Sequence, residues 1–184
     1  MFPASRIFGP LRVTFFVLTC LTSWMVSASE QSYRTTSDVL ALGLPVVAAA
    51  ISVAQDDGSG FLQLAKSEAF TLLSVEILKR ATHKTRPNGE DDRSFPSGHS
   101  AVAFAAAQYM YQRGGWEYGV PAYLAASAVA YSRVRANEHY WRDVLAGAAL
   151  GIASSYYFTD SRERVRFSVM FGPRSAYAQI YSSW

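Results

Sequence analysis

Apolar residues recur every three or four positions through most of the chain beyond residue 36, a spacing that places them on one face of an α-helix. Turn and capping residues separate the apolar runs. Ser37 and Asp38 have the side chains of an N-cap, and an Asp-Gly-Ser-Gly turn and a Gly-Gly pair interrupt the pattern further on. The predicted helices are residues 37–56, 61–86, 97–112, 119–134 and 143–158. The pattern therefore predicts an all-α fold, a helical bundle of five to six helices.

The two ends of the chain have other patterns. Residues 1–28 combine basic residues near the start, an apolar run and the small-residue sequence Val-Ser-Ala, which is typical of a signal peptide. An uncleaved first membrane helix, the sixth of the bundle, is the alternative. In residues 166–184, apolar and polar positions alternate on both sides of a Gly-Pro turn, which predicts a short C-terminal β-hairpin. Residues 29–165 remain as one helical domain.

Charged residues in the helix at 61–86 bear on its surroundings. Lys66, Glu68 and Glu76 interrupt the apolar pattern, and a charge inside a bilayer costs at least ~2.5 kcal/mol on insertion scales. These charges favour a domain that lies against the outer side of the inner membrane over a protein with six spanning helices.

The composition narrows the class of protein. Of the 184 residues, 50% are hydrophobic, enough for one sizeable core. Without Arg6 and Arg12 of the leader, the 17 basic residues become 15, against 14 acidic ones, so we expect no nucleic-acid partner. Cys20 is the only cysteine, so the mature domain has no disulfide.

Three short clusters contain residue types that carry chemistry. In the first, Lys79 and Arg86 are seven residues apart, about two helical turns, so one helix face presents both if the helix continues that far. Basic residues near the C-terminal end of a helix are also favoured by the helix dipole, so this pair alone has a structural explanation.

The second cluster is Pro96-Ser97-Gly98-His99, at the start of a predicted helix. Proline restricts the residue before it to extended conformations, and glycine permits a close approach of the backbone. The first amides of a helix lack an intrahelical acceptor, which makes a helix start an anion site. An ordinary serine cap explains Ser97 equally well but leaves His99 unexplained.

The third cluster contains Arg133, His139 and Asp143. His139 and Asp143 are four residues apart, so the carboxylate can accept a hydrogen bond from the imidazole and fix its tautomer. An imidazole held in this way serves as a general base or as a nucleophile. A surface pair at a helix start is the alternative.

Taken together, the clusters supply two histidines, three cations and a helix start, the groups that phosphoryl transfer without a metal requires. The three histidines of the chain, His83 included, lack the spacing of metal ligands. We therefore expect neither a metal nor another cofactor.

In these clusters the chain resembles the type 2 phosphatidic acid phosphatases (PAP2), which share a fold and an active site with vanadium haloperoxidases and bacterial class A acid phosphatases. The family signature is Lys, six residues, Arg-Pro; then Pro-Ser-Gly-His; then Ser-Arg, five residues, His, three residues, Asp. The chain matches every fixed position between Lys79 and Asp143. The resemblance implies a PAP2-like phosphatase domain at residues 29–165, with the hairpin as an extension.

The resemblance also implies a role for each matching residue. His139 is expected to be the nucleophile that forms a phosphohistidine, with Asp143 at its other ring nitrogen. His99 is expected to protonate the leaving oxygen and then to activate water. The phosphoryl oxygens are expected to be bound by Lys79, Arg86, Ser97, Gly98 and Arg133.

Several residues near the clusters occupy no signature position. The basic ones are expected to be surface charges: Arg80, His83, Lys84 and Arg135. The aromatic ones are expected to pack in the core, or alternatively to line the route of a lipid tail: Phe95, Tyr131, Tyr140 and Trp141.

The complete signature in an apolar, exported chain predicts a metal-independent lipid phosphatase that faces the periplasm at the inner membrane and contacts that membrane. The expected substrate is a phosphate monoester or pyrophosphate of a phosphatidate-like, isoprenoid or lipid A molecule, and no protein partner is required. The alternatives are a soluble periplasmic acid phosphatase for small esters, a vanadium haloperoxidase and a non-catalytic envelope protein.

Overall fold

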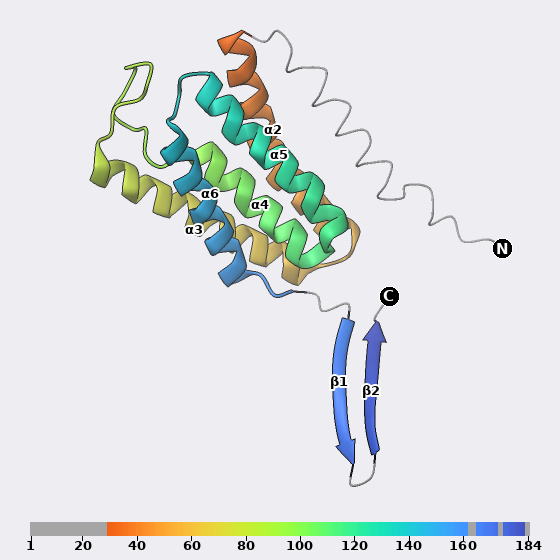
Figure 1. Cartoon of the computed structure of the whole chain (residues 1–184). Coiled ribbons are helices and arrows are strands. Elements are labelled where there is room, and N and C mark those ends of the chain that lie inside the picture. The colour runs from red at the N-terminus through yellow and green to blue at the C-terminus, as the bar shows by residue number, and fades with distance from the viewer. Residues whose placement is uncertain (1–28, 162–164, 173–174, 183–184) are drawn as a thin grey trace, which may run out of the picture.

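Five α-helices form the N-terminal part of the computed structural model, which describes residues 29–161, 165–172 and 175–182. The expected leader at residues 1–28 lies outside the described residues. The helices are α2 (Glu30–Ala54), α3 (Gly58–Thr82), α4 (Gly98–Gly114), α5 (Trp116–Arg135) and α6 (Trp141–Phe158). The prediction of an all-α helical bundle is confirmed (Figure 1).

The start of α2 and the end of α3 differ most from the predicted helix ends, and both differences reshape the functional region. The N-cap of α2 is Ser29, whose hydroxyl accepts a hydrogen bond from Ser32 N at 3.3 Å, so Ser37 and Asp38 lie inside the helix instead of capping it. The helix α3 ends at Thr82 because the next residue, His83, adopts a left-handed conformation with φ of 45°. Arg86 therefore belongs to the loop after α3, not to the helix.

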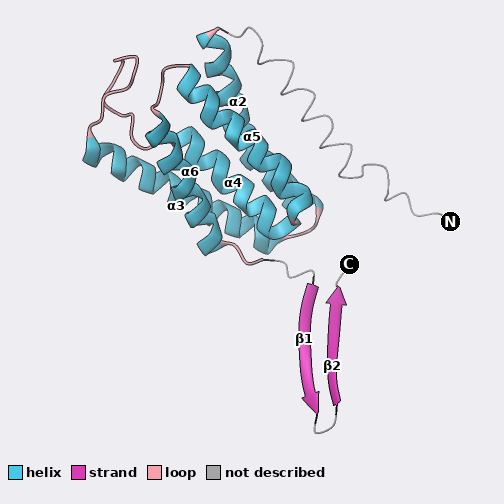
Figure 2. Ribbon diagram, in the orientation of Figure 1, coloured by secondary structure: helices cyan, strands magenta, loops and turns pink. Residues whose placement is uncertain are grey.

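The helices run alternately up and down, and α4 is the central one because it contacts each of the other four (Figures 1 and 2). Its buried face is made of alanines, so the neighbouring helices approach its backbone closely. Gly147 and Gly151 of α6 lie directly against this backbone, where an added Cβ would collide with the carbonyl oxygens of Ser97 and Ala101. This close contact holds the start of α6 beside the start of α4.

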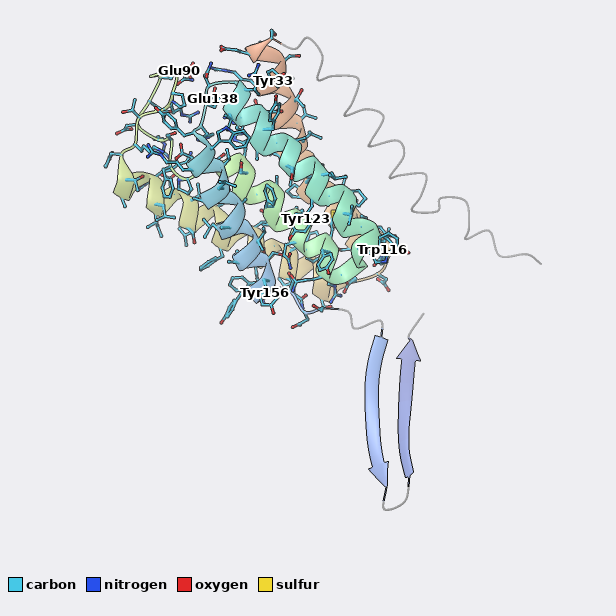
Figure 3. The ribbon with its side chains drawn as sticks, viewed as in Figure 1. Tyr33, Glu90, Trp116, Tyr123, Glu138 and Tyr156 are labelled. Atoms are coloured by element: carbon cyan, nitrogen blue, oxygen red, sulfur yellow. The ribbon has the colours of Figure 1, made fainter. Side chains whose placement is uncertain are left out.

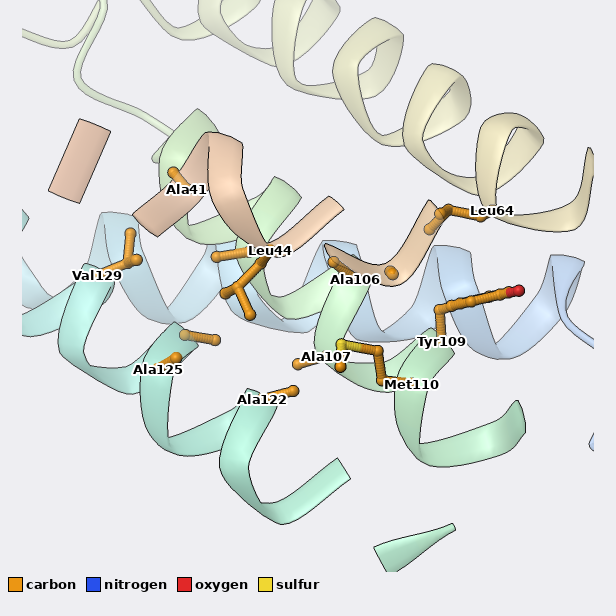
Figure 4. Close-up of a cluster of buried hydrophobic side chains, with 13 residues drawn as sticks. Ala41, Leu44, Leu64, Ala106, Ala107, Tyr109, Met110, Ala122, Ala125 and Val129 are labelled. Carbon is orange, nitrogen blue, oxygen red and sulfur yellow. The ribbon is translucent and has the colours of Figure 1, made fainter. Parts of the chain in front are cut away.

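A hydrophobic core cluster lies between α2, α4 and α5, with Leu64 of α3 at its edge, and is built mainly from small side chains (Figure 4). Its larger members are Leu44, Leu64, Tyr109, Met110 and Val129. Two polar side chains inside the bundle donate across it: Gln112 to Thr159 O at 2.9 Å, and Ser154 to Ser67 O at 2.9 Å. Small residues thus fill much of the interior, and some of its polar side chains tie neighbouring segments together.

Large apolar side chains point outward from several helices. More than two fifths of the surface of each is exposed for Val39, Leu42, Val46, Phe61, Phe70, Leu72, Leu73, Ile77, Trp116, Leu124, Leu145 and Tyr157. A small-residue interior with an apolar exterior is typical of helices packed in lipid, and large exposed apolar surfaces are rare on monomeric soluble proteins. Among the described helices, α2 is the one whose length and composition suffice to cross a membrane.

Two antiparallel strands follow the bundle, at the position where the alternating pattern predicts a hairpin. They are β1 (Val165–Gly172) and β2 (Ser175–Ser182). In their register Val165 pairs with Ser182 and Gly172 pairs with Ser175.

Candidate active site

The three sequence clusters meet at one end of the bundle. The first turn of α2, the last turn of α3, the start of α4, the last turn of α5 and the start of α6 lie there, together with the loop at residues 83–97 (Figures 1 and 2). In Figure 3, Tyr33, Glu90 and Glu138 mark this end and Trp116 marks the opposite one. Alternating helix direction explains the convergence, because it returns every second helix end to the same side.

His139 lies in the short connection between α5 and α6 and is 2% exposed. Its Nδ1 lies 2.7 Å from the carbonyl oxygen of Ser94, and a carbonyl only accepts hydrogen bonds. The proton is therefore on Nδ1, and the lone pair is on Nε2. Burial, followed by the positive charge of Arg133 and of Arg86, lowers the pKa of His139 to about 3. The imidazole is thus neutral at pH 7 and able to act as a nucleophile.

Asp143 lies in the first turn of α6, as expected, but it is not the acceptor at His139 Nδ1. Its carboxylate is completely buried and accepts from Ser94 Oγ at 2.6 Å, from Tyr140 N at 3.1 Å and from the ammonium of Lys84. Burial raises the pKa of Asp143, but the hydrogen bonds from Lys84 and Ser94 lower it by more, so the pKa lies below its usual range. Asp143 therefore acts on His139 through Ser94: it holds the serine whose carbonyl orients the imidazole.

Lys84 is not the surface charge that the sequence predicts. Only 19% of its side chain is exposed, since its ammonium reaches Asp143 and lies 4.6 Å from the centre of the Tyr140 ring. A lysine beside a fully buried carboxylate compensates its charge, and the aromatic face adds a cation–π contact. Lys84 is therefore part of the structure that supports His139.

The three predicted phosphate-binding cations lie near both histidines. Positive charge from Arg133, Arg86 and Lys79 lowers the pKa of His99 as well as that of His139, which requires all three cations to lie near both rings. Lys79 is itself half-buried, and burial followed by repulsion from Arg86 lowers its pKa.

Glu138, next to the nucleophile, was not identified from the sequence and proves central. This buried carboxylate pairs with Arg133 at 3.3 Å, with Arg34 of α2 at 3.0 Å and with Arg86. Arg86 also donates to Asp91 at 2.7 Å. Glu138 thus joins arginines from three separate segments and fixes the spacing of two phosphate-binding ones.

The start of α4 supplies the predicted helix-terminal site. Ser97 caps the helix, and its own amide donates to Asp143 O at 2.9 Å, which couples α4 to α6. A Cβ on Gly98 would meet only Val75, at an ordinary 3.5 Å, so the packing of the described residues does not require glycine there. The amides of Gly98 and His99, the first two of α4, have no acceptor within the helix and are available to an anion, whereas Ser97 Oγ accepts from Ser100 N.

His99 in the first turn of α4 has a partner that the sequence did not reveal. Its Nε2 lies 3.0 Å from Oδ1 of Asp38 on α2, and the same oxygen accepts from Arg133 Nη1 at 2.9 Å. Arg133 Nη1 also donates to Ser37 Oγ at 3.2 Å. Burial, followed by the charge of Arg133, lowers the pKa of His99 to about 4 in spite of Asp38.

The structure also places the other residues near the clusters, some of them as expected and some not. His83 is exposed and pairs with Asp92 at 2.9 Å, and Arg80 is exposed beside Glu76, as expected for surface residues. Tyr140 and Trp141 are 40% and 55% exposed, so the default expectation that they pack in the core is wrong. Within residues 29–161, no group of three His, Cys, Asp or Glu side chains is arranged to hold a metal ion.

The chain is similar in sequence to a family model and to two described phosphatases. A sequence model described as the PAP2 superfamily matches residues 78–166. A Porphyromonas gingivalis protein described as lipid A 1-phosphatase is 44% identical over 82 residues, 42% of this chain and 18% of the relative. A Helicobacter pylori protein described as lipid A 4'-phosphatase is 33% identical over 127 residues, 63% of this chain and 64% of the relative. The chain thus covers less than two thirds of either relative.

The fold has a counterpart among solved structures. The crystal structure of Aquifex aeolicus LpxE matches with a TM-score of 0.62 over 85% of this chain and 98% of that one, at 18% identity. At this level of identity the likeness establishes the fold.

Proposed function

This chain belongs to the PAP2 superfamily, and from that membership we propose that it is a metal-independent lipid phosphatase working through a phosphohistidine on His139. The observation that carries the proposal is the state of His139: a buried, neutral imidazole with its proton on Nδ1, its lone pair on Nε2 and three cations around it. Both curated relatives are described as lipid A phosphatases, which supports a phosphorylated lipid as substrate.

In the first step, His139 Nε2 attacks phosphorus and the bond from phosphorus to the leaving oxygen breaks. Lys79, Arg86 and Arg133 compensate the charge on the phosphoryl oxygens, together with Ser97 and the amide of Gly98 at the start of α4. His99 donates its proton to the leaving oxygen. The products are the dephosphorylated lipid and a phosphohistidine.

In the second step, the now neutral His99 takes a proton from water, whose oxygen attacks the phosphohistidine. The bond between His139 Nε2 and phosphorus breaks, inorganic phosphate leaves, and both histidines return to their starting states. A phosphate dianion beside Arg133, Arg86 and Lys79 offsets the positive charge that lowers the pKa of His99, so substrate itself promotes the protonated acid.

The exterior of the bundle supports a membrane location. Apolar side chains on α2, α3 and α6 form the band that would contact the hydrocarbon, and the site lies at one end of this band. A phosphate attached to a lipid lies at the same depth, at the surface of the bilayer. We place this end on the periplasmic side, in accord with the export signal or first membrane helix expected at residues 1–28.

The decisive experiment is a substrate panel on detergent-purified protein, with a His139→Ala variant as the blank. Phosphate release from phosphorylated lipids that exceeds release from small soluble esters is the expected result. Preference for small esters would favour the soluble acid phosphatase, and release from neither class would refute the enzyme.

Two further measurements test the parts of the proposal. Labelled phosphate should be trapped on the wild type in acid-labile, base-stable form and should be absent from His139→Ala. Vanadate should compete with substrate, while chelators should leave activity intact; the opposite results would count against the phosphohistidine and the metal-free step respectively. The protein should sediment with membranes and enter solution only with detergent.

A further inference from the structure

The carboxylate of Asp38 touches the phosphate site from a helix that carries no signature residue. Its Oδ1 lies 3.0 Å from His99 Nε2 and 2.9 Å from Arg133 Nη1, so one oxygen bridges the proposed acid and a proposed phosphate-binding cation. The side chain is 52% exposed, whereas Arg133 is buried between Ser37 and Glu138. Asp38 is thus the exposed member of a mostly buried cluster.

The position of this oxygen shows that Asp38 faces the leaving-group side of the phosphate. Under the proposed function, His99 Nε2 gives its proton to the leaving oxygen, so the leaving oxygen must take the place that Asp38 Oδ1 holds. A rotation of an exposed side chain suffices to clear that place, and it leaves the carboxylate within a few ångströms of whatever the leaving group carries. The negative charge of Asp38 therefore repels a negatively charged leaving group.

The two substrate classes differ in that charge. The leaving group of a phosphate monoester is an alcohol, which is neutral after His99 protonates it. The leaving group of a lipid diphosphate is a lipid monophosphate, which carries negative charge on oxygens next to the bond that breaks. Two like charges a few ångströms apart near a protein surface repel strongly enough to change a rate by about tenfold or more.

We infer that Asp38 is a specificity-determining residue that selects lipid phosphate monoesters over lipid diphosphates. The inference rests on the proposed function and narrows its substrate class. The other charges that shift the pKa of His99 most are those of Arg133 on α5, Lys79 on α3 and Arg86 in the loop, and all three are cations that attract either substrate. Among these neighbours, Asp38 supplies the discriminating negative charge.

The test compares Asp38→Asn with the wild type on a phosphate monoester and a diphosphate that share one lipid tail. Asparagine keeps an oxygen that accepts from His99 and Arg133, so the change removes charge and preserves shape. The matched control is Asp92→Asn, because Asp92 is also an exposed carboxylate 2.9 Å from a histidine, His83, at the same end of the bundle.

For Asp38→Asn, kcat/KM for the diphosphate relative to the monoester should rise about tenfold, while Asp92→Asn and Asp38→Glu should retain the wild-type ratio. An unchanged ratio in Asp38→Asn, with activity present, overturns the inference and leaves the phosphatase standing. Absence of activity on both substrates in the wild type refutes the phosphatase instead.

A measurement on the wild type guards against a variant that fails to fold. Inorganic phosphate should inhibit monoester hydrolysis at lower concentration than inorganic diphosphate, by about tenfold, since the second phosphate group meets Asp38. Equal inhibition, or stronger inhibition by diphosphate, contradicts the inference.

Discussion

Replacing Gly151 by alanine tests whether the close contact between α6 and α4 positions the active site. Gly151 lies in the middle of α6, and a Cβ there would lie 2.9 Å from Ala105 N and 3.0 Å from the carbonyl carbon of Ala101, with the Ala101 oxygen closer still. These neighbours are backbone atoms of the central helix and cannot rotate away. The two helices must separate.

The size of the effect follows from two opposing terms. Alanine favours a helix over glycine by about 1 kcal/mol, whereas overpacking a tight contact costs about 1–3 kcal/mol. The net loss of up to about 2 kcal/mol lowers the unfolding midpoint of a chain of this size by up to roughly 8 °C. Restoring normal contact distances needs about 1 Å of helix movement, and a misplacement of that size costs up to ~100-fold in rate.

The catalytic effect has a structural route. Asp143 begins the helix that Gly151 holds, and its carbonyl accepts from Ser97 N at 2.9 Å across the same contact. Movement of α6 therefore shifts Asp143 and Ser94 away from the start of α4. Activity should fall more than the loss of stability alone explains.

The assay is thermal unfolding in detergent together with kcat on a lipid phosphate. The control is Gly43→Ala in α2, where a Cβ meets no atom within 4 Å, so the change should stabilise by about 0.4–1 kcal/mol and leave kcat unaltered. If Gly151→Ala unfolds at or above the wild-type temperature with full activity, the close contact has no role in positioning the site.

Three further outcomes follow from the contacts of the site. Lys84→Met should lower kcat about tenfold or more because it leaves the buried Asp143 without its cation, whereas Arg80→Met, at an exposed position, should retain wild-type activity; equal effects would contradict the role of Lys84. The pKa of His139 in the folded chain, about 3, lies below the ~6.5 of an unfolded imidazole, so its contribution to stability is complete above pH 6.5 and is lost as the pH falls towards 3. Between pH 7 and 4 the wild type should therefore lose about 3 kcal/mol more stability than His139→Asn, measured by unfolding at each pH; parallel curves would argue against a buried neutral imidazole. Glu138→Gln leaves three arginines short of a negative charge, so inorganic phosphate should raise its unfolding temperature more than that of the wild type, and a smaller rise would refute the charge balance.

The sequence pattern predicted the five helices, because hydrophobic periodicity is a local property. The family signature selected His99, His139 and the three cations, and the folded chain brings these residues to one end of the bundle. The sequence pattern misassigned Asp38 because serine and aspartate before an apolar run are also typical of an N-cap, and the cap at Ser29 lies in a polar stretch without that pattern. It missed Lys84 because basic residues after a helix are common on surfaces. Partners that come from distant segments, such as Asp38 for His99, have no signature in local spacing.

The arrangement of His139 and Asp143 could not be predicted from their spacing alone. A spacing of four residues permits a direct hydrogen bond, but in the folded chain Ser94 lies between the two, with its hydroxyl on the carboxylate and its carbonyl on the imidazole. The loop at residues 83–97 brings Ser94 there, and its path depends on the end of α3 at Thr82 and on contacts with α2, which include Arg34 to Glu90 at 3.0 Å.

The charges on α3 also have a different meaning in three dimensions. Glu76 pairs with Arg80 and Arg93 near the site end, and the carboxylate oxygens of Glu68 are buried within the protein, so neither presents a bare charge to the apolar band. Lys66 is exposed, but a lysine extends its ammonium along the helix towards water. Counting charges along a helix therefore overestimated the cost of placing α3 beside lipid.

The helix α2 lies outside the region that the superfamily model matches, yet Arg34, Ser37 and Asp38 reach Glu138, Arg133 and His99. The chemistry and its adjustment thus occupy separate stretches of sequence that meet only in the folded chain. Substitutions in α2 can therefore change substrate preference at the site without altering a signature residue. Chimeras that exchange α2 between relatives should therefore transfer substrate preference while the reaction stays the same.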